Sequence, residues 1–333
     1  MSSLRIGIVY ELLGSLAPRP EDPPDADAEY EPEATIRALE AAVVHAGHVP
    51  VRVGRPHDLL AQIGKGELPA LDAAWNIAEG YGSRNREAWA PVLLEMAGVP
   101  AIGSDALTLS TSLDKCWAAT QVRAAGVPTP DQACAGSAAE AEKMCLPGSF
   151  PLFLKPRWEG TAKGIRTTSR VANRPDLVRE VARIVRDYRQ PALIETFLGG
   201  PEYTVTVVGN DPPRALPVLQ RALDAETDIG FHAVAHGAES DRPARLPGAL
   251  DAPLEAELAQ LALRVYTALE CRDFARVDFR LDAEGVAHFL EINPLPTFAP
   301  EGSFGILAEL EGRPLAELLA EILTAALRRL GFP

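Results

Sequence analysis

The chain has 333 residues, of which 47% are hydrophobic and 23% charged, proportions typical of a globular protein with two or three domains. Its formal net charge of −14 argues against a nucleic-acid partner, because binding to a phosphate backbone requires a basic surface. Apolar runs stay well below the roughly 18 residues of a membrane-spanning helix, so we also expect no membrane partner.

The beginning of the chain and the cysteines both predict a cytoplasmic protein. A strand-like run starts at Leu4, and it lacks the basic-then-apolar order of a signal peptide. The four cysteines contain no CxxC pair, so the sequence indicates neither a zinc ribbon nor a redox motif, and we expect reduced thiols.

The N-terminal part of the chain alternates between two kinds of segment. Apolar runs predict strands at 4–10, 48–53, 72–77 and 99–102. Amphipathic segments between them predict helices at 34–45 and 86–97. This alternation predicts a parallel α/β domain over residues 1–109. Between its first strand and first helix, residues 18–33 are rich in Pro, Asp and Glu and predict an extended acidic loop.

Two further domains are predicted after this one. The second, 110–198, contains expected helices at 113–125, 138–145 and 176–188 and strands at 150–155 and 192–197. The third, 199–333, starts at a Gly-Gly pair and contains strands near 203–208 and 216–220, a loop at 221–250, a helix at 254–269, two more strands and a final helix at 314–330. The expected fold class is therefore mixed α/β and α+β.

A β-hairpin is predicted in the third domain by two alternating strands around a turn ending in Gly, at 274–281 and 286–293. If Leu281 pairs with Val286, Arg276 lies opposite Glu291. Residues two apart along a strand share a face, as do directly opposed residues. Four polar side chains then project from one face: Arg276, Asp278, Glu291 and Asn293.

This face has the composition of a cation site. Asp278, Glu291 and Asn293 supply carboxylate and carboxamide oxygens, and Mg²⁺ prefers a few such ligands together with phosphates and water. Arg276 beside them can neutralise the charge of a transferring phosphoryl group. A solvated sheet face with a cross-strand Arg–Glu pair is the alternative interpretation. The Pro-Leu-Pro run after Asn293 ends the strand abruptly and favours a site at this edge.

Two lysines precede segments suited to phosphate. Lys155 ends an apolar run, and burying it without an anion would be costly. The following loop, 156–164, has two glycines and a threonine, so its backbone N–H groups could surround a polyphosphate. Lys115 stands near the start of a predicted helix, where anions are favoured. Each feature alone also fits an ordinary turn or a surface lysine.

Glu195 and Glu202 flank a Gly-Gly-Pro turn between two predicted strands. A hinge of this kind suits adenine and ribose, since backbone groups can pair with the base and a carboxylate can accept from ribose hydroxyls. A polar linker between two domains fits the same residues.

Taken together and in this order, these segments resemble the ATP-grasp superfamily, and most closely D-alanine–D-alanine ligase and its relatives. The similarity extends from the first strand to the final helix. The matching stretches are 112–115 (SLDK), 153–164 (FLKPRWEGTAKG), 193–205 (LIETFLGGPEYTV), 276–278 (RVD) and 289–293 (FLEIN).

The resemblance implies a role for each matched residue. ATP would be bound by Lys115, Lys155, Glu159, Gly160, Thr161, Glu195, Thr196, Phe197, Leu198 and Glu202. One or two Mg²⁺ ions would be held by Asp278, Glu291 and Asn293. Arg276 would stabilise the transferring phosphate and the tetrahedral intermediate. Glu31 falls near the acid that binds the amino group of the first substrate, and Ser303 matches a serine of the acceptor pocket.

The resemblance further implies an ATP-grasp fold, with ATP between two α+β domains, and a homodimer. The implied activity joins a small carboxylate or amino acid to an amine through an acyl phosphate. Three segments depart from the family pattern: the run after Asn293, the loop 221–250, which lacks the usual Lys and Tyr, and 75–87, which replaces a His-Gly segment. We therefore expect a substrate pair that need not be two D-alanines.

Two alternatives remain open from the sequence. One is an ATP-grasp enzyme that phosphorylates or ligates a different small carboxylate in specialised metabolism. The other is a non-catalytic nucleotide-binding module, against which the intact set of metal ligands argues.

Overall fold

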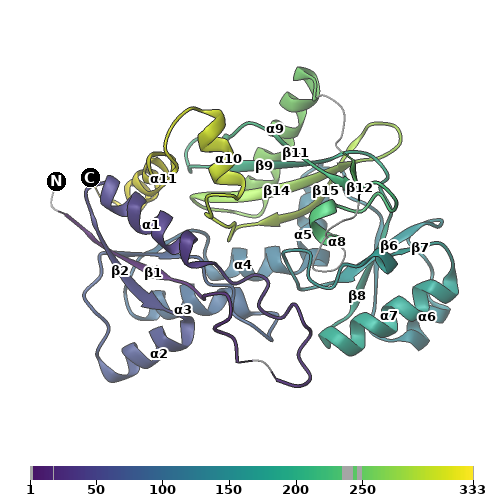
Figure 1. Ribbon diagram of the computed structural model, residues 1–333, viewed down its shortest axis with the longest axis horizontal. Helices are drawn as coiled ribbons and strands as arrows, with labels where there is room; N and C mark the ends of the chain where they lie inside the picture. Colours follow the sequence, from purple (N-terminus) through teal and green to yellow (C-terminus); the bar gives the residue numbers. More distant parts are fainter. Residues whose placement is uncertain (1–2, 18, 235–242, 246–249, 333) are drawn as a thin grey trace.

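The computed structural model describes residues 3–17, 19–234, 243–245 and 250–332 and contains three separate main sheets (Figure 1). The first is parallel, with strand order β2-β1-β3-β4. Its strands are β1 (Arg5–Val9), β2 (Val49–Gly54), β3 (Ala73–Asn76) and β4 (Ala101–Ile102). Helices of this region are α1 (Glu33–His45), α2 (Pro56–Lys65), the short η1 (Arg86–Ala88) and α3 (Trp89–Met96).

The second sheet is antiparallel, with order β5-β8-β6-β7. Its strands are β5 (Gln132–Ala135), β6 (Leu152–Pro156), β7 (Arg170–Val171) and β8 (Ala192–Thr196). Before it come α4 (Ala106–Leu113) and α5 (Lys115–Ala124), and around it lie α6 (Ala138–Lys143), η2 (Thr167–Ser169) and α7 (Arg174–Tyr188). The predicted helix 113–125 is in fact interrupted at Asp114, which has an extended backbone and caps α5 by accepting from the N–H groups of Cys116 and Trp117.

The third sheet is also antiparallel, with order β10-β9-β14-β15 and β11 beside β9. Its strands are β9 (Glu202–Val208), β10 (Arg214–Ala215), β11 (Leu219–Arg221), β14 (Phe274–Leu281) and β15 (Ala287–Asn293). Three elements lie in the stretch predicted as a loop: β12 (Leu223–Asp224), α8 (Phe231–Val234) and β13 (Ala244–Arg245). The rest of that stretch includes 235–242 and 246–249, which lie outside the described residues. Helix α9 (Ala252–Ala268) follows it.

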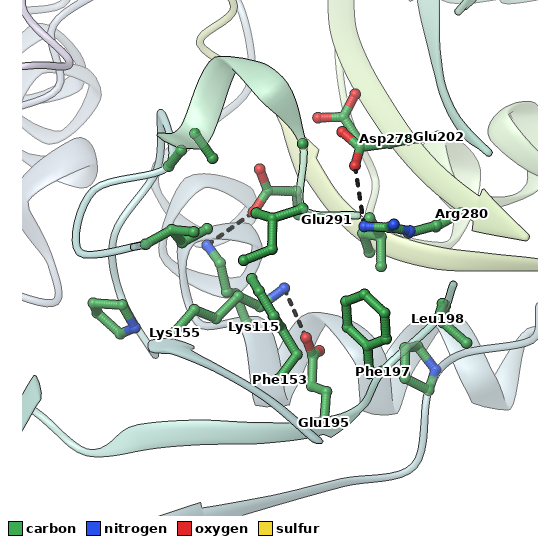
Figure 2. A pocket seen from close by; sticks show the side chains of 18 of the residues that line it. Lys115, Phe153, Lys155, Glu195, Phe197, Leu198, Glu202, Asp278, Arg280 and Glu291 are labelled. Atoms are coloured by element: carbon green, nitrogen blue, oxygen red, sulfur yellow. Dashed lines mark ion pairs between the residues drawn. The ribbon is translucent and has the colours of Figure 1, made fainter. Parts of the chain in front are cut away.

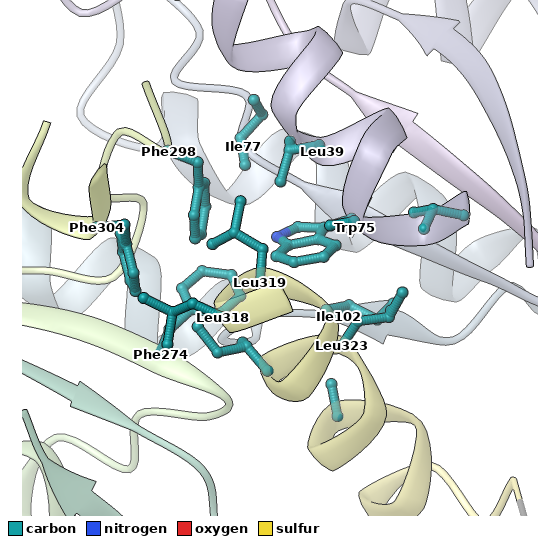
Figure 3. Packing of buried hydrophobic residues seen from close by; sticks show 14 of the residues in the cluster. Leu39, Trp75, Ile77, Ile102, Phe274, Phe298, Phe304, Leu318, Leu319 and Leu323 are labelled. Atoms are coloured by element: carbon teal, nitrogen blue, oxygen red, sulfur yellow. The ribbon is translucent and has the colours of Figure 1, made fainter. Parts of the chain in front are cut away.

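The last two helices, α10 (Ser303–Leu310) and α11 (Leu315–Arg329), return to the first sheet. Leu318, Leu319 and Leu323 of α11 share one buried cluster with Trp75 of β3 (Figure 3). Aromatic rings join this cluster to the third sheet: Trp75 stacks on Phe274 at 5.9 Å between centroids, and Phe298 meets Trp75 edge-on at 5.4 Å. These rings bury much apolar surface and couple the first sheet to β14. Among the described residues, no helix is both long enough and apolar enough to cross a membrane.

The β14–β15 register corrects the predicted one. Leu281 pairs with Ala287 rather than Val286, because the Asp282 carboxylate accepts the Val286 N–H and holds that residue in the turn. A shift of one residue would turn the predicted face over. A bulge at Leu290 compensates, since the pairing moves from Phe279–Phe289 to Asp278–Glu291. The four predicted polar residues therefore do share a face, but Arg276 lies opposite Asn293.

Candidate active site between the second and third sheets

A cavity of about 800 Å³, including its mouth, lies between the second and third sheets (Figure 2). Strand β6, strand β8 and the hinge after β8 form one wall, and β9, β14 and β15 form the other. Gly230 lines the cavity as well, together with His232 and Ala233 of the adjoining helix α8. Most residues predicted to bind nucleotide or metal line this cavity: Lys115, Lys155, Glu159, Glu195, Thr196, Phe197, Leu198, Glu202, Asp278 and Glu291.

Both predicted lysines are buried and paired with carboxylates. Lys115 is the first residue of α5, and its Nζ lies 3.1 Å from Glu291 and 2.5 Å from the carbonyl oxygen of Glu159. Lys155 on β6 pairs with Glu195 of the neighbouring β8 at 2.9 Å. Burial lowers the pKa of Lys155, but Glu195 and Glu291 outweigh that effect and the pKa ends above its ordinary value. The cavity therefore holds, in Lys155, an ammonium group that stays charged at neutral pH.

The predicted cation ligands lie where β14 and β15 pair. One oxygen of Asp278 accepts from the Thr204 hydroxyl at 2.6 Å, and the other accepts from Arg276 at 3.0 Å. Burial would raise the pKa of Glu291, but Lys115, Lys155 and Arg276 hold it at about 2. Because Glu291 is anionic, this set of two carboxylates and one carboxamide fits a hard divalent cation.

Asn293 lies at the junction with the first sheet. Its Oδ1 accepts from the Leu295 N–H at 2.8 Å, which orients the side chain at the end of β15. Together with Lys115, Glu291 and Gly160, it lines a smaller cavity of about 350 Å³. The two cavities share Lys115 and Glu291. The candidate metal site therefore faces the main cavity on one side and the buried acids of the smaller cavity on the other.

The hinge after β8 supplies an aromatic platform. Phe197 lies 6.2 Å from Phe153 between ring centroids, and the guanidinium groups of Arg170 and Arg280 lie 4.4 and 5.1 Å from its ring. Glu202 begins β9 and lies 3.7 Å from Arg280. Burial raises the pKa of Glu202 to about 7, with Arg280 acting in the opposite direction.

The loop after β6 divides its three predicted residues between different surroundings. Glu159 lines the main cavity and pairs with Lys163 at 2.5 Å. Gly160 lines the smaller cavity. Thr161 is exposed, with a left-handed φ of 47°, and belongs to a separate surface cleft. Of the three predicted residues, only Glu159 faces the main cavity, although Ala162 and Lys163 of the same loop line it as well.

Glu31 and Ser303 are both buried, and neither is among the residues that line the two cavities. Glu31 accepts hydrogen bonds from Thr35 at 2.7 Å and from Thr297 at 2.8 Å. Burial raises the pKa of Glu31, and the two hydroxyls counteract part of that rise. Glu31 therefore connects α1 to the segment that follows Asn293. Ser303 is the first residue of α10.

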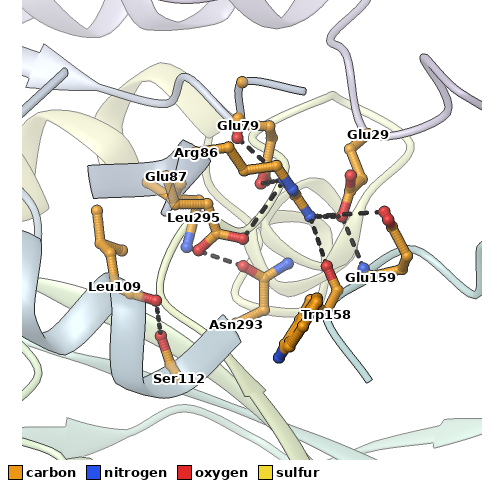
Figure 4. A network of polar contacts seen from close by, with 12 residues as sticks. Glu29, Glu79, Arg86, Glu87, Leu109, Ser112, Trp158, Glu159, Asn293 and Leu295 are labelled. Atoms are coloured by element: carbon orange, nitrogen blue, oxygen red, sulfur yellow. Dashed lines mark hydrogen bonds and ion pairs between the residues drawn. The ribbon is translucent and has the colours of Figure 1, made fainter. Parts of the chain in front are cut away.

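A buried polar network that sequence reasoning missed adjoins the smaller cavity (Figure 4). Arg86, only 2% exposed, lies 2.8 Å from Glu29, 3.3 Å from Glu79 and 3.6 Å from Glu87. Burial raises the pKa of Glu87 to about 7 and that of Glu79 well above its usual range, although Arg86 lowers both. The charged residues of 18–33 and 75–87 were visible in the sequence, but nothing local indicated that they meet.

Comparison with known proteins shows the family of the chain. Residues 123–324 match the family model described as D-ala D-ala ligase C-terminus. The uncharacterized protein y4sG of Sinorhizobium fredii is 32% identical over 77% of this chain and 74% of its own length. A D-alanine–D-alanine ligase of Stutzerimonas stutzeri is 30% identical over 88% of each chain.

Solved structures share the fold. VanG D-Ala:D-Ser ligase from Enterococcus faecalis aligns with a TM-score of 0.72 at 17% identity, over 98% of this chain and 100% of its own. D-alanine–D-alanine ligase from Bacillus anthracis in complex with ATP aligns with a TM-score of 0.69 at 21% identity, over 98% of both chains. The chain belongs to the D-alanine–D-alanine ligase family and is an ATP-dependent, amide-bond-forming ligase with the ATP-grasp fold.

Proposed function

We propose that this protein uses Mg·ATP to activate a small carboxylate or amino acid as an acyl phosphate, which an amine then attacks. The observation that carries the proposal is the convergence of Lys115, Lys155, Asp278 and Glu291 in one cavity between the two antiparallel sheets, with Arg276 bonded to Asp278. Such an arrangement pairs anionic ligands for a cation with cationic groups for phosphate, which phosphoryl transfer requires.

ATP would lie along the main cavity. The hinge from Glu195 through Leu198 would contact the adenine, with Phe197 as its flat apolar surface, and Glu202 would accept from the ribose hydroxyls. Lys115 and Lys155 would bind the phosphates, exchanging part of their present pairing with Glu291 and Glu195. Asp278, Glu291 and Asn293 would hold one or two Mg²⁺ ions, which neutralise phosphate charge and orient the γ-phosphoryl group.

The reaction would proceed in two displacements. An oxygen of the substrate carboxylate attacks the γ-phosphorus and ADP leaves. The amine then attacks the acyl carbon, and phosphate departs with the carboxylate oxygen that it gained. Arg276, whose guanidinium is fixed on Asp278 at 3.0 Å, would balance the charge that develops in both steps.

The substrate side supports a pair that need not be two D-alanines. The run after Asn293 places Thr297 against the buried Glu31, so this carboxylate is engaged by protein hydroxyls. Nearby, Glu29, Glu79 and Glu87 surround Arg86 in the segment that departs from the family pattern. These acidic segments depart from the family pattern, whereas the residues proposed to bind ATP match it. The combination favours a carboxylate or amine substrate other than D-alanine.

Three further features belong to the same proposal. The domains would be 1–109, 110–198 and 199–333, with the last two holding ATP between them. The protein would be cytoplasmic and would form a homodimer, as the family resemblance implies.

The direct test of substrate class is phosphate release from Mg·ATP, screened against single and paired D- and L-amino acids, with mass analysis of the products. We expect release with a specific pair and a condensed product. D-alanine alone giving the dipeptide would retain the ligase reaction and refute the altered substrate pair. A phosphorylated product without condensation would refute the second step.

Replacing Glu202 by Gln should stabilise the ligand-free protein and weaken ATP binding. The pKa of Glu202 is about 7 in the folded protein, against an ordinary value of 4.5. The folded state therefore binds more protons between these values, and stability falls as pH rises from 4.5 to 7. Gln removes this cost, worth about 2–3 kcal/mol above pH 7, and loses one acceptor for ribose.

Denaturant unfolding without Mg²⁺ at pH 5 and pH 8, with calorimetry of ATP binding, checks this expectation. The gain in unfolding free energy should be clear at pH 8 and small at pH 5. Glu257→Gln, at an exposed position on α9, is the control and should show no such pH dependence. An equal gain at both pH values would show that Glu202 does not titrate as argued.

A further inference from the structure

The loop from Arg157 to Gly164, which borders the nucleotide cavity, is held by the acidic segment of the first domain. The Glu29 side chain is only 3% exposed, and its carboxylate accepts from the Gly160 N–H at 2.7 Å and from Lys163 at 3.0 Å. The same carboxylate pairs with Arg86 at 2.8 Å. These partners are therefore buried charges and a loop amide, and Figure 4 shows Glu29 facing Arg86.

A second anchor fixes the other end of the loop. Asp25, four residues before Glu29, accepts from the Gly164 N–H at 2.9 Å and from the Tyr188 hydroxyl at 2.7 Å. The contact at Gly160 is tight: a Cβ there would lie 2.6 Å from the Glu29 carboxylate. Both ends of the turn 160–164 thus depend on one segment of the first domain.

The loop in turn fixes a nucleotide-site residue. The carbonyl of Glu159 accepts from Lys115 Nζ at 2.5 Å, and Lys115 also pairs with Glu291 at 3.1 Å. Arg86 adds a bond to the Trp158 carbonyl at 3.4 Å. A continuous set of contacts therefore runs from Glu29, through the loop, to the lysine proposed to bind phosphate.

Breaking this connection would be costly. Burial raises the pKa of Glu29, but Arg86, Lys163 and the Gly160 N–H outweigh it and hold the pKa at about 2. Glu29 is then anionic at any physiological pH. Its removal would leave two buried cations and one loop amide with fewer partners, which is strongly unfavourable.

We propose that Glu29 is a positioning residue of the ligase: it ties the loop 157–164 to the acidic segment of the first domain and so sets the position of Lys115 for nucleotide. The effect of Glu29 on catalysis rests on the proposed function, but its contacts with the loop can be tested without turnover. It makes nucleotide affinity depend on a residue that does not line the main cavity.

The test compares Glu29→Gln with Glu21→Gln. Glu21 belongs to the same segment, but its carboxylate is exposed and lies 4.0 Å from Arg189, a weak ion pair. Hydrogen exchange of peptides covering 157–166 and calorimetry of a non-hydrolysable ATP analogue with Mg²⁺ are the measurements. In Glu29→Gln we expect at least about tenfold faster exchange in this loop and about tenfold weaker analogue binding, with exchange in β9 unchanged. Glu21→Gln should match the wild type.

If Glu29→Gln does not fold, Asp25→Asn replaces it, because this change alters only the second anchor. The same faster loop exchange and weaker analogue binding are then expected. Loop exchange and analogue affinity equal to wild type in the folded variants would overturn the proposal. Uniformly faster exchange across the whole chain would do so as well, because it indicates general destabilisation. Exchange needs no substrate, so failure of the proposed ligase reaction is recognised separately, as absent phosphate release with an intact loop response.

Discussion

Glu291→Gln should reduce phosphate release from Mg·ATP by at least about a thousandfold, the largest effect expected of any single replacement in this site. Gln keeps the size and an oxygen but removes the negative charge that Lys115, Lys155 and Arg276 stabilise, with the pKa of Glu291 held at about 2. A cation would lose one of its two carboxylates, and its charge would no longer be balanced beside the γ-phosphate.

Steady-state phosphate release over a range of Mg²⁺ concentrations checks this prediction. High Mg²⁺ should restore part of the activity, because the lost ligand weakens cation binding first. Glu284→Gln, in the exposed turn of the same hairpin, is the matched control and should retain wild-type rates. Turnover by Glu291→Gln within about threefold of wild type would remove this residue from the metal site.

Lys155→Met should cause two separable losses. The buried Glu195 carboxylate, now 2.9 Å from Lys155, would lose its partner, and we expect the free energy of unfolding to fall by about 3–5 kcal/mol. Nucleotide affinity should fall by about a hundredfold, because a buried ammonium facing the phosphates is removed.

The double variant Lys155→Met with Glu195→Gln separates the two effects. It removes both charges, so most of the lost stability should return while nucleotide binding stays weak. Denaturant unfolding and calorimetry with an ATP analogue give the two values. Restored binding in the double variant would mean that Lys155 serves only to neutralise Glu195.

The grouping of the residues that line the main cavity could be predicted from sequence because its signals are local. Lys155 at the end of an apolar strand and the alternating pattern of β14 and β15 place their side chains by periodicity alone. The hairpin register was predicted wrongly, because Val286 belongs to a turn that the Asp282 side chain closes and Leu290 forms a bulge. The misplaced turn and the unpredicted bulge each shift the register by one residue, so the same four residues still share one face.

The buried polar network beside the smaller cavity could not be assembled from sequence in the same way. Arg86 and Lys163 lie 57 and 134 residues after Glu29 in the chain, and the three residues meet only in the folded protein. Nothing in the periodicity of an acidic, proline-rich segment predicts a buried carboxylate. The role of α8 as a wall of the cavity was missed for a related reason, since this short helix lies in a stretch that has the composition of a loop.

The central claim is that a substrate carboxylate is activated as an acyl phosphate, and transfer of ¹⁸O from that carboxylate tests it most directly. With the active substrate pair and a doubly ¹⁸O-labelled carboxylate, one labelled oxygen should appear in each phosphate released, as read by mass spectrometry or ³¹P NMR. Unlabelled phosphate, formed together with an amide product, would contradict the acyl-phosphate mechanism.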